Sequence, residues 1–178
     1  PYKTMAYAIN NNSTGMIFVL MGQSSETAFT IPANKTNIDI VAFGTRSALN
    51  GFTQAVSVAG TGAGSVRFQD INFGAGLTRV STSNCGIYLY NGSISGSGFK
   101  NEGNGYTEFN DVDASNANNT ITAGTFTVNA GKLIAPAVSG TGTFVTINNA
   151  GSIIGNATVA IGSRFSCILS IWIAGTTG

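Results

Sequence analysis

The sequence contains nearly the same phrase twice. The stretch GTFTVNAGKLI occupies residues 124–134, and GTFVTINNAGSII follows at residues 142–154. A unit of about 20 residues is too short to bury its own apolar side chains, so a repeat of this length is typical of solenoids, in which each unit stacks on the next. This repeat restricts the possible folds more than any other feature of the chain.

Apolar residues recur along the chain at the same spacing. The last apolar residue of each short apolar–x–apolar segment returns after 21, 20, 19 and 19 residues, at Phe68, Leu89, Phe109, Val128 and Ile147. Two more apolar series follow, one through Ile71, Ile94, Val112, Leu133 and Ile153, the other through Leu77, Phe99, Ile121, Val138 and Val159. Short alternating segments between Gly, Asn and Ser turns are strands rather than helices. Three such strands per repeat predict a triangular coil, and the stacked coils predict an all-β parallel β-helix with about 20 residues per coil.

The repeat is looser toward the beginning of the chain. Val19 and Ile40 lie 21 residues apart, and a longer coil of 28 residues leads on to Phe68, with its extra residues in a loop near residues 48–54. The first stretch, PYKTMAYAINNN (1–12), has the pattern of a short helix closed by asparagines. The end of a solenoid exposes an open core and an unpaired strand edge, so this helix is predicted to be an N-terminal cap.

The last stretch of the chain also departs from the pattern. SRFSCILSIWIAGTTG (163–178) has the densest apolar run and breaks the period, which predicts a C-terminal cap or an oligomer contact. We therefore expect a single β-helix domain over 1–178. Its expected parts are a cap with the first coils over 1–44, further coils over 45–156 and a C-terminal cap over 157–178.

Composition excludes several classes of function. Only 8% of the residues are charged and the formal net charge is +1, whereas a nucleic-acid-binding protein needs a clustered basic surface. The chain has no histidine, so we expect no metal site and no cofactor, and any catalysis would use carboxylates. No apolar run reaches the ~20 residues of a membrane-spanning helix, so we expect no membrane insertion. Cys85 and Cys167 stand in surroundings typical of buried thiols, with a disulfide as the alternative.

Residues beside the first inward series point outward and form two ladders along the solenoid. One ladder is Arg67, Tyr88, Glu108, Thr127 and Thr146, and the other is Gln69, Tyr90, Asn110, Asn129 and Asn148. Arg67, Tyr88, Tyr90 and Glu108 combine flat aromatic faces with polar groups, as sites for sugar rings do, and are the candidate glycan-binding residues. The alternatives are a face that packs against sister chains and an ordinary exposed rung. The three asparagines favour a ladder of amides that hydrogen-bond along the axis.

Two aspartates are the candidate catalytic residues. Asp70 and Asp111 occupy the same register two coils apart, which places their α-carbons about 9.6 Å from one another, twice the strand spacing. Inverting glycosidases hold their carboxyl pair roughly 6.5–9.5 Å apart. Asn91 stands between them in register, and aspartate or asparagine at the end of a strand is ordinarily a turn residue. The residue types favour the turn interpretation.

The first 44 residues carry a resemblance to a known family. PYKTMAYAI, an apolar strand and then FTIPANKTNIDIVAFG resemble the first coils of pectate-lyase-like right-handed parallel β-helices, and among these the tailspikes and tail fibres of bacteriophages. The resemblance implies a right-handed solenoid and a homotrimer on the virion tail, outside the cell. It also implies contacts with other tail fibre segments and with bacterial surface polysaccharide.

The same resemblance leaves two functions open. Enzymatic members usually have longer coils and loops that wall a groove holding carboxylates, whereas these coils are near the minimum length. We therefore expect a receptor-binding or structural segment that is not an enzyme. The alternative is a polysaccharide depolymerase, a glycoside hydrolase or lyase, that uses carboxylates such as Asp70 and Asp111.

Overall fold

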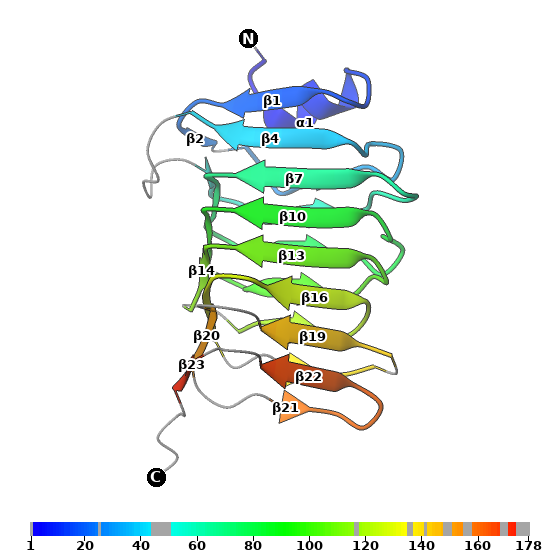
Figure 1. Ribbon diagram of the computed structural model, residues 1–178. Helices are drawn as coiled ribbons and strands as arrows, with labels where there is room; N and C mark the ends of the chain where they lie inside the picture. The colour runs from blue at the N-terminus through cyan, green and yellow to red at the C-terminus, as the bar shows by residue number, and fades with distance from the viewer. Residues whose placement is uncertain are drawn as a thin grey trace.

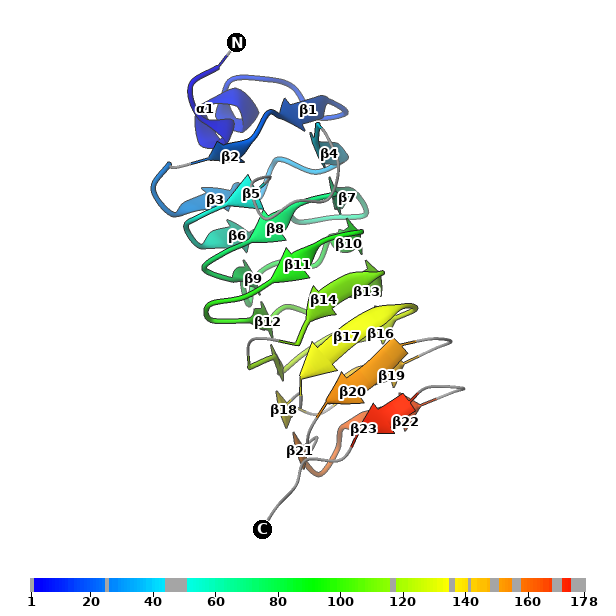
Figure 2. The same ribbon diagram turned by 90° about the vertical axis from the view of Figure 1, so that its left-hand side faces the viewer.

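The computed structural model describes residues 2–24, 26–43, 51–115, 118–134, 137–140, 142–147, 151–154, 158–167 and 171–173. Over these residues the chain winds into a right-handed parallel β-helix with one short helix at its N-terminal end (Figures 1 and 2). Each full coil contributes one strand to each of three sheets, and the strands of successive coils pair in parallel. This arrangement confirms the predicted fold class.

The three sheets, which we name A, B and C in the order in which a coil visits them, run the length of the solenoid. Sheet A contains β1 (Ile17–Leu20), β4 (Ile38–Ala42), β7 (Ser65–Gln69), β10 (Gly86–Tyr90), β13 (Tyr106–Asn110), β16 (Thr125–Val128), β19 (Phe144–Ile147) and β22 (Arg164–Cys167). Sheet B contains β2 (Gln23–Ser24), β5 (Gly51–Phe52), β8 (Asn72–Phe73), β11 (Ser93–Ile94), β14 (Val112–Ala114), β17 (Gly131–Ile134), β20 (Gly151–Ile154) and β23 (Ile171–Ile173). Sheet C contains β3 (Phe29–Ile31), β6 (Val56–Val58), β9 (Leu77–Arg79), β12 (Phe99–Asn101), β15 (Thr120–Ile121), β18 (Ala137–Val138) and β21 (Thr158–Val159).

The inner face of sheet A follows the predicted register. Ile40 pairs with Phe68 across the 28-residue coil, and the pairs continue coil by coil through Leu89, Phe109, Val128 and Ile147. From Ile40 to Val128 each of these side chains is at most 1% exposed. Strands form here because alternate residues are apolar, and burying them removes their surface from water.

The stretch where we expected a loop contains a strand. Gly51 and Phe52 form β5, which pairs with β2 and β8, so this part of the long coil continues sheet B. Thr53 and Gln54 follow β5 as a bend, and residues 48–50 of the predicted loop lie outside the described residues.

The first strand corrects one inward residue. Val19 pairs with Val41 and is 56% exposed, whereas its neighbours Phe18 and Leu20 point into the core. Phe18, not Val19, is therefore the partner of Ile40. The segment MIFVLM is apolar at every position, so its sequence does not determine which side chains point inward.

Two further inward series need correction in their register. In sheet B, Phe73 pairs with Ile94 and Ala114 pairs with Leu133, so the predicted Ile71 and Val112 are wrong as rungs. Both are nonetheless buried, because a shift of two residues keeps a side chain on the same face.

In sheet C, Phe99 pairs with Leu77, as predicted, but Ile121 pairs with Asn101 rather than with Phe99. Asn101 is polar, so a period of apolar residues does not identify it as a member of this rung.

The core of sheet C therefore contains a buried polar group. Arg79 is fully buried, and its guanidinium donates hydrogen bonds to the carbonyl oxygens of Cys85 (2.7 Å) and Tyr106 (2.7 Å) and to Oγ1 of Thr107 (2.8 Å). Thr107 in turn donates to Oδ1 of Asn101. Only Nε of Arg79 has no partner among the described residues. Burial lowers the pKa of Arg79 to about 10 because the charged form loses hydration.

The N-terminal helix confirms the predicted cap. It is α1 (Met5–Asn10), and Thr4 caps it by accepting a hydrogen bond from the N–H of Tyr7. The carboxylate of Glu26 accepts hydrogen bonds from the two helix N–H groups before that of Tyr7, those of Met5 and Ala6, at 3.1 Å each.

The predicted break of the period near the C-terminus is wrong. β22 pairs in register with β19, and β23 pairs with β20, so the coils continue at least to Ile173. The dense apolar run supplies two more strands because its alternate residues fall on the same rungs as those of the preceding coils. Residues 174–178 lie outside the described part of the chain.

Candidate ligand site on the outer face of sheet A

The two outward ladders predicted from the sequence are present on the described part of sheet A, although Thr127 is buried there at 9% exposure. Tyr88 pairs with Arg67 on one side and Glu108 on the other. Tyr90 pairs with Gln69 and Asn110 in the same way. The polar and aromatic side chains of β7, β10 and β13 therefore lie on one outer face, one strand spacing apart.

Three of the four predicted glycan-binding residues line a shallow hollow on this face. The hollow has a volume of about 220 Å³ and is lined by Ser65, Arg67, Tyr88 and Tyr90. Ser65 was missed by the sequence analysis, because it lies one rung before the two ladders considered there. Gly86 makes room for the Tyr88 ring: a Cβ atom at Gly86 would lie 2.8 Å from Cε2 of Tyr88 and 3.4 Å from Cβ of Ser65.

An ion pair orients the arginine of the hollow. Nε of Arg67 lies 2.8 Å from Oδ1 of Asp39, its register partner on β4. The Arg67 side chain is 53% exposed, so this pair contributes little to stability. Its effect is geometric, because holding the guanidinium by Nε leaves the two Nη groups as donors for a ligand.

Glu108, the fourth predicted residue, does not line the hollow. Its Oε2 accepts from the Tyr106 hydroxyl (2.7 Å), and its Oε1 accepts from the side-chain amides of Asn110 (2.8 Å) and Asn129 (2.8 Å). The Tyr106 ring then rests beside the Tyr88 ring, with 5.8 Å between their centroids. Glu108 thus supports the aromatic wall of the site from behind and is not itself presented to a ligand.

Part of the predicted amide ladder is present beside this network. Nδ2 of Asn129 donates to Oδ1 of Asn110 at 2.9 Å, which joins β13 to β16 along the axis. Asn148, the third predicted member, lies outside the described residues.

Burial on this face favours the protonated form of two tyrosines, Tyr90 and Tyr106. Burial is the main cause that raises the pKa of Tyr90, and the nearby charge of Glu108 raises it further, against the opposing effect of Arg67. Burial likewise is the main cause that raises the pKa of Tyr106. A neutral phenol both donates and accepts a hydrogen bond, which suits recognition of sugar hydroxyls.

The candidate catalytic aspartates occupy one corner of the solenoid, between sheets A and B. Asp70, Asn91 and Asp111 all adopt left-handed backbone conformations, with φ of 60°, 51° and 54°. The backbone N–H of Asp70 donates to the carbonyl of Tyr90, and that of Asn91 to the carbonyl of Asn110. Asparagine and aspartate tolerate this conformation better than other residues with a Cβ atom, so the geometry matches the turn interpretation. A catalytic role for Asp70 and Asp111 stays a prediction.

Other features of the described residues bear on chemistry. Within them, no group of three His, Cys, Asp or Glu side chains could hold a metal ion. Cys85 is buried as a free thiol, and burial raises its pKa. The side chain of Cys167 lies outside the described part of the structure. No helix in the described ranges has the length and apolar character needed to cross a membrane.

Comparison with family models, curated proteins and solved structures gave no match for this chain. The fold and the site therefore define the class of the protein by themselves. It is a parallel β-helix with a shallow aromatic and cationic hollow on one outer sheet.

Proposed function

We propose that the chain is the β-helix segment of a bacteriophage tail fibre or tailspike, and that it binds bacterial surface polysaccharide through the outer face of sheet A. In this proposal the segment stands outside the cell on the virion tail, assembles as a homotrimer and joins other fibre segments. The observation that carries the binding proposal is the hollow lined by Ser65, Arg67, Tyr88 and Tyr90.

The chemistry of the hollow fits sugar rings. The apolar face of a pyranose stacks on an aromatic ring, and its edge hydroxyls form hydrogen bonds with neighbouring polar groups. Tyr88 and Tyr90 supply both the aromatic rings and hydroxyl groups for hydrogen bonds, and Ser65 adds a further hydroxyl. The Nη donors of Arg67 favour an acidic sugar, because a guanidinium binds a carboxylate through two parallel hydrogen bonds. A shallow, open site also suits one segment of a long polymer.

Binding without cleavage is the function that this face supports best. The two carboxylates beside the hollow in register are already engaged, because Glu108 accepts three hydrogen bonds and Asp39 pairs with Arg67. A general acid or base must instead be within reach of the substrate. The alternative, a depolymerase, rests on Asp70 and Asp111 sharing one corner of the solenoid.

The Tyr88→Ala variant tests this function. We expect it to weaken binding to an acidic capsular or O-antigen polysaccharide, taken from a panel of purified polymers, by roughly tenfold or less per site, because one stacking platform is lost. Its melting temperature and its mass by light scattering should not change. Tyr7→Ala is the matched control, since Tyr7 is 57% exposed on α1, away from the hollow, and its loss should leave binding intact.

Other outcomes would change the proposal. If Tyr88→Ala lowers the melting temperature or the mass before it affects binding, the face is a contact between chains. New reducing ends that vanish in Asp111→Asn would favour the depolymerase. A wild-type protein that binds none of the polymers would contradict the proposed function, and a monomer at micromolar concentration would contradict the trimer.

A further inference from the structure

The N-terminal end of sheet A has an open strand edge. β1 is the outermost strand of the sheet and pairs only with β4 (Figure 1). The carbonyl oxygens of Met16 and Leu20 accept hydrogen bonds from β4. Because backbone groups alternate in direction along a strand, the N–H and C=O groups of Ile17 and Val19 point away from β4, toward the open edge.

Apart from the neighbouring cap helix, β1 itself has none of the sequence features that usually keep another strand away. Exposed edges in soluble proteins commonly have a charge, a proline or a bulge. The segment Met16–Met21 is MIFVLM, without charge or proline. Its outward side chains are among the most exposed apolar groups of the described residues, at 66% for Ile17, 56% for Val19 and 79% for Met21.

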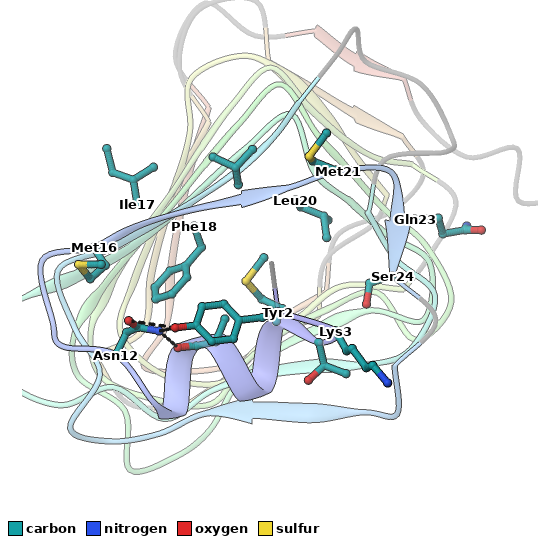
Figure 3. A pocket seen from close by; sticks show the side chains of 14 residues that line it. Tyr2, Lys3, Asn12, Met16, Ile17, Phe18, Leu20, Met21, Gln23 and Ser24 are labelled. Carbon is teal, nitrogen blue, oxygen red and sulfur yellow. Dashed lines mark hydrogen bonds between the residues drawn. The ribbon is translucent and has the colours of Figure 1, made fainter.

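Behind the edge, the cap does not fill all of the space beside β1. A hollow of about 400 Å³ lies between β1 and α1 (Figure 3). Phe18 and Leu20 point into it from β1, and Met5 and Ala8 line it from the helix. The hollow is where the inward side chains of one more strand, stacked on β1, would be located.

The charge at this end indicates what such a strand carries. Lys3 lines the hollow on the side of Ser24, toward the carboxyl end of β1 (Figure 3). Its ammonium has no ion-pair or hydrogen-bond partner among the described residues, whereas the carboxylate of Glu26 is occupied by the N–H groups of α1. A strand parallel to β1 would bring its own carboxyl end to the side of Lys3.

We propose that β1 and the hollow behind it bind one extended segment of another polypeptide, in parallel with β1. The segment has apolar side chains at alternate positions, which enter the hollow, and a carboxylate at its C-terminal end, which pairs with Lys3. Backbone hydrogen bonds to Ile17 and Val19 provide the direction and the register, as in other cases of strand addition. This contact is separate from the polysaccharide face and does not depend on it.

A synthetic peptide with the sequence of residues 37–43, NIDIVAF, is the probe. This sequence already pairs in parallel with β1 on its other side. We expect the peptide with a free carboxyl terminus to bind the full chain. The peptide with an amidated terminus should bind a few times more weakly, because an exposed ion pair contributes little.

Two variants of Val19 isolate the backbone contact. Val19→Pro removes an N–H that faces the open edge, where proline is compatible with a strand, and should weaken binding roughly tenfold or more. Val19→Ala keeps the N–H and should weaken it less. Ala8→Leu, which fills the hollow, should also reduce affinity. If Val19→Pro fails to fold, a peptide N-methylated at alternate residues removes the same kind of hydrogen bond from the other partner.

Three results would overturn the proposal. The first is no binding of the peptide to the wild-type chain at millimolar concentration. The second is equal binding by wild type, Val19→Pro and the N-methylated peptide. The third is self-association of the wild type that Val19→Pro abolishes, which would make a second copy the occupant.

Discussion

The inner faces of sheets A and C differ in how they fill the same core. Sheet A presents apolar residues on the rung from Ile40 to Val128 without interruption. On sheet C the rung of Val58 continues through Arg79 and Asn101, which are both fully buried, before it returns to Ile121. One rung of the core is therefore apolar throughout and the other includes polar side chains, although sheet A also buries Thr107 on its neighbouring rung.

The difference has a cause at the corner between sheets C and A. There the chain passes from one ladder to the next, so that Cys85 and Ala123 lie outside the strands and Tyr106 is the first residue of β13. Arg79 donates to the carbonyls of Cys85 and Tyr106, and Asn101 donates to that of Ala123. A buried carbonyl without a donor costs free energy, so a polar side chain from the rung replaces the missing strand partner. Apolar residues alone can fill the core only where the backbone groups form their hydrogen bonds with one another.

The largest effect should come from a charge placed on the inner face of sheet A. Phe68→Asp should prevent folding, because a buried carboxylate without a partner costs about 5 kcal/mol or more, which is comparable with the whole stability of many domains. Gln69→Asp is the matched control, since Gln69 is the next residue and is exposed. Circular dichroism and urea unfolding measure both variants. If Phe68→Asp folds and Gln69→Asp does not, the assignment of inward and outward residues on sheet A is wrong.

A smaller effect should follow from removing the polar group of sheet C. Arg79→Met should lower the free energy of unfolding by about 2–4 kcal/mol, because two buried carbonyls and Oγ1 of Thr107 lose their donor. Lys100→Met is the control, because it makes the same chemical change at an exposed position of the same sheet and should stay within about 0.5 kcal/mol of wild type. An Arg79→Met variant as stable as wild type would show that the cost of burying the guanidinium cancels its hydrogen bonds.

The smallest effect should be a change of the free energy of unfolding with pH, caused by Cys85 at the same corner. Burial raises the pKa of Cys85 above its ordinary value of 9.0. The unfolded chain therefore loses this proton first as pH rises, and the free energy of unfolding should fall as pH passes the ordinary value and approaches the raised pKa of Cys85. Above pH 10 the lowered pKa of Arg79 acts in the opposite direction. Cys85→Ala should flatten the fall in a series of denaturant titrations, and an unchanged slope would assign the fall to other groups.

The sequence predicted the fold wherever alternation was unambiguous. The spacing from Phe68 to Ile147 is nearly constant, and each of these inward residues is flanked by polar residues or tyrosines. Sheet A and its outward ladders were therefore predicted in register. Val19 was misplaced because its segment is apolar on both faces. In sheet C the rung was misread because Arg79 and Asn101 point inward, and no local pattern distinguishes a buried arginine from an exposed one.

The candidate site could be predicted as a neighbourhood but not as a cavity. The period placed Arg67, Tyr88 and Tyr90 side by side, because adjacent coils differ by one strand spacing. It could not place the carboxylate of Glu108, which turns toward Tyr106 and two asparagines rather than toward the hollow. The direction of such a side chain depends on which of several nearby donors binds it in three dimensions, and the sequence does not show which donor this is.

The network around Arg79 also affects how the solenoid comes apart. In a stack whose units touch only their neighbours, stability is approximately a sum of terms for each coil and coupling terms between adjacent coils. The hydrogen bonds from Arg79 through Thr107 and Asn101 to the carbonyl of Ala123 cross successive coils. They strengthen the coupling in the middle of the stack. Fraying that starts at either end therefore meets a barrier at these coils, which makes them the last part of the solenoid to open.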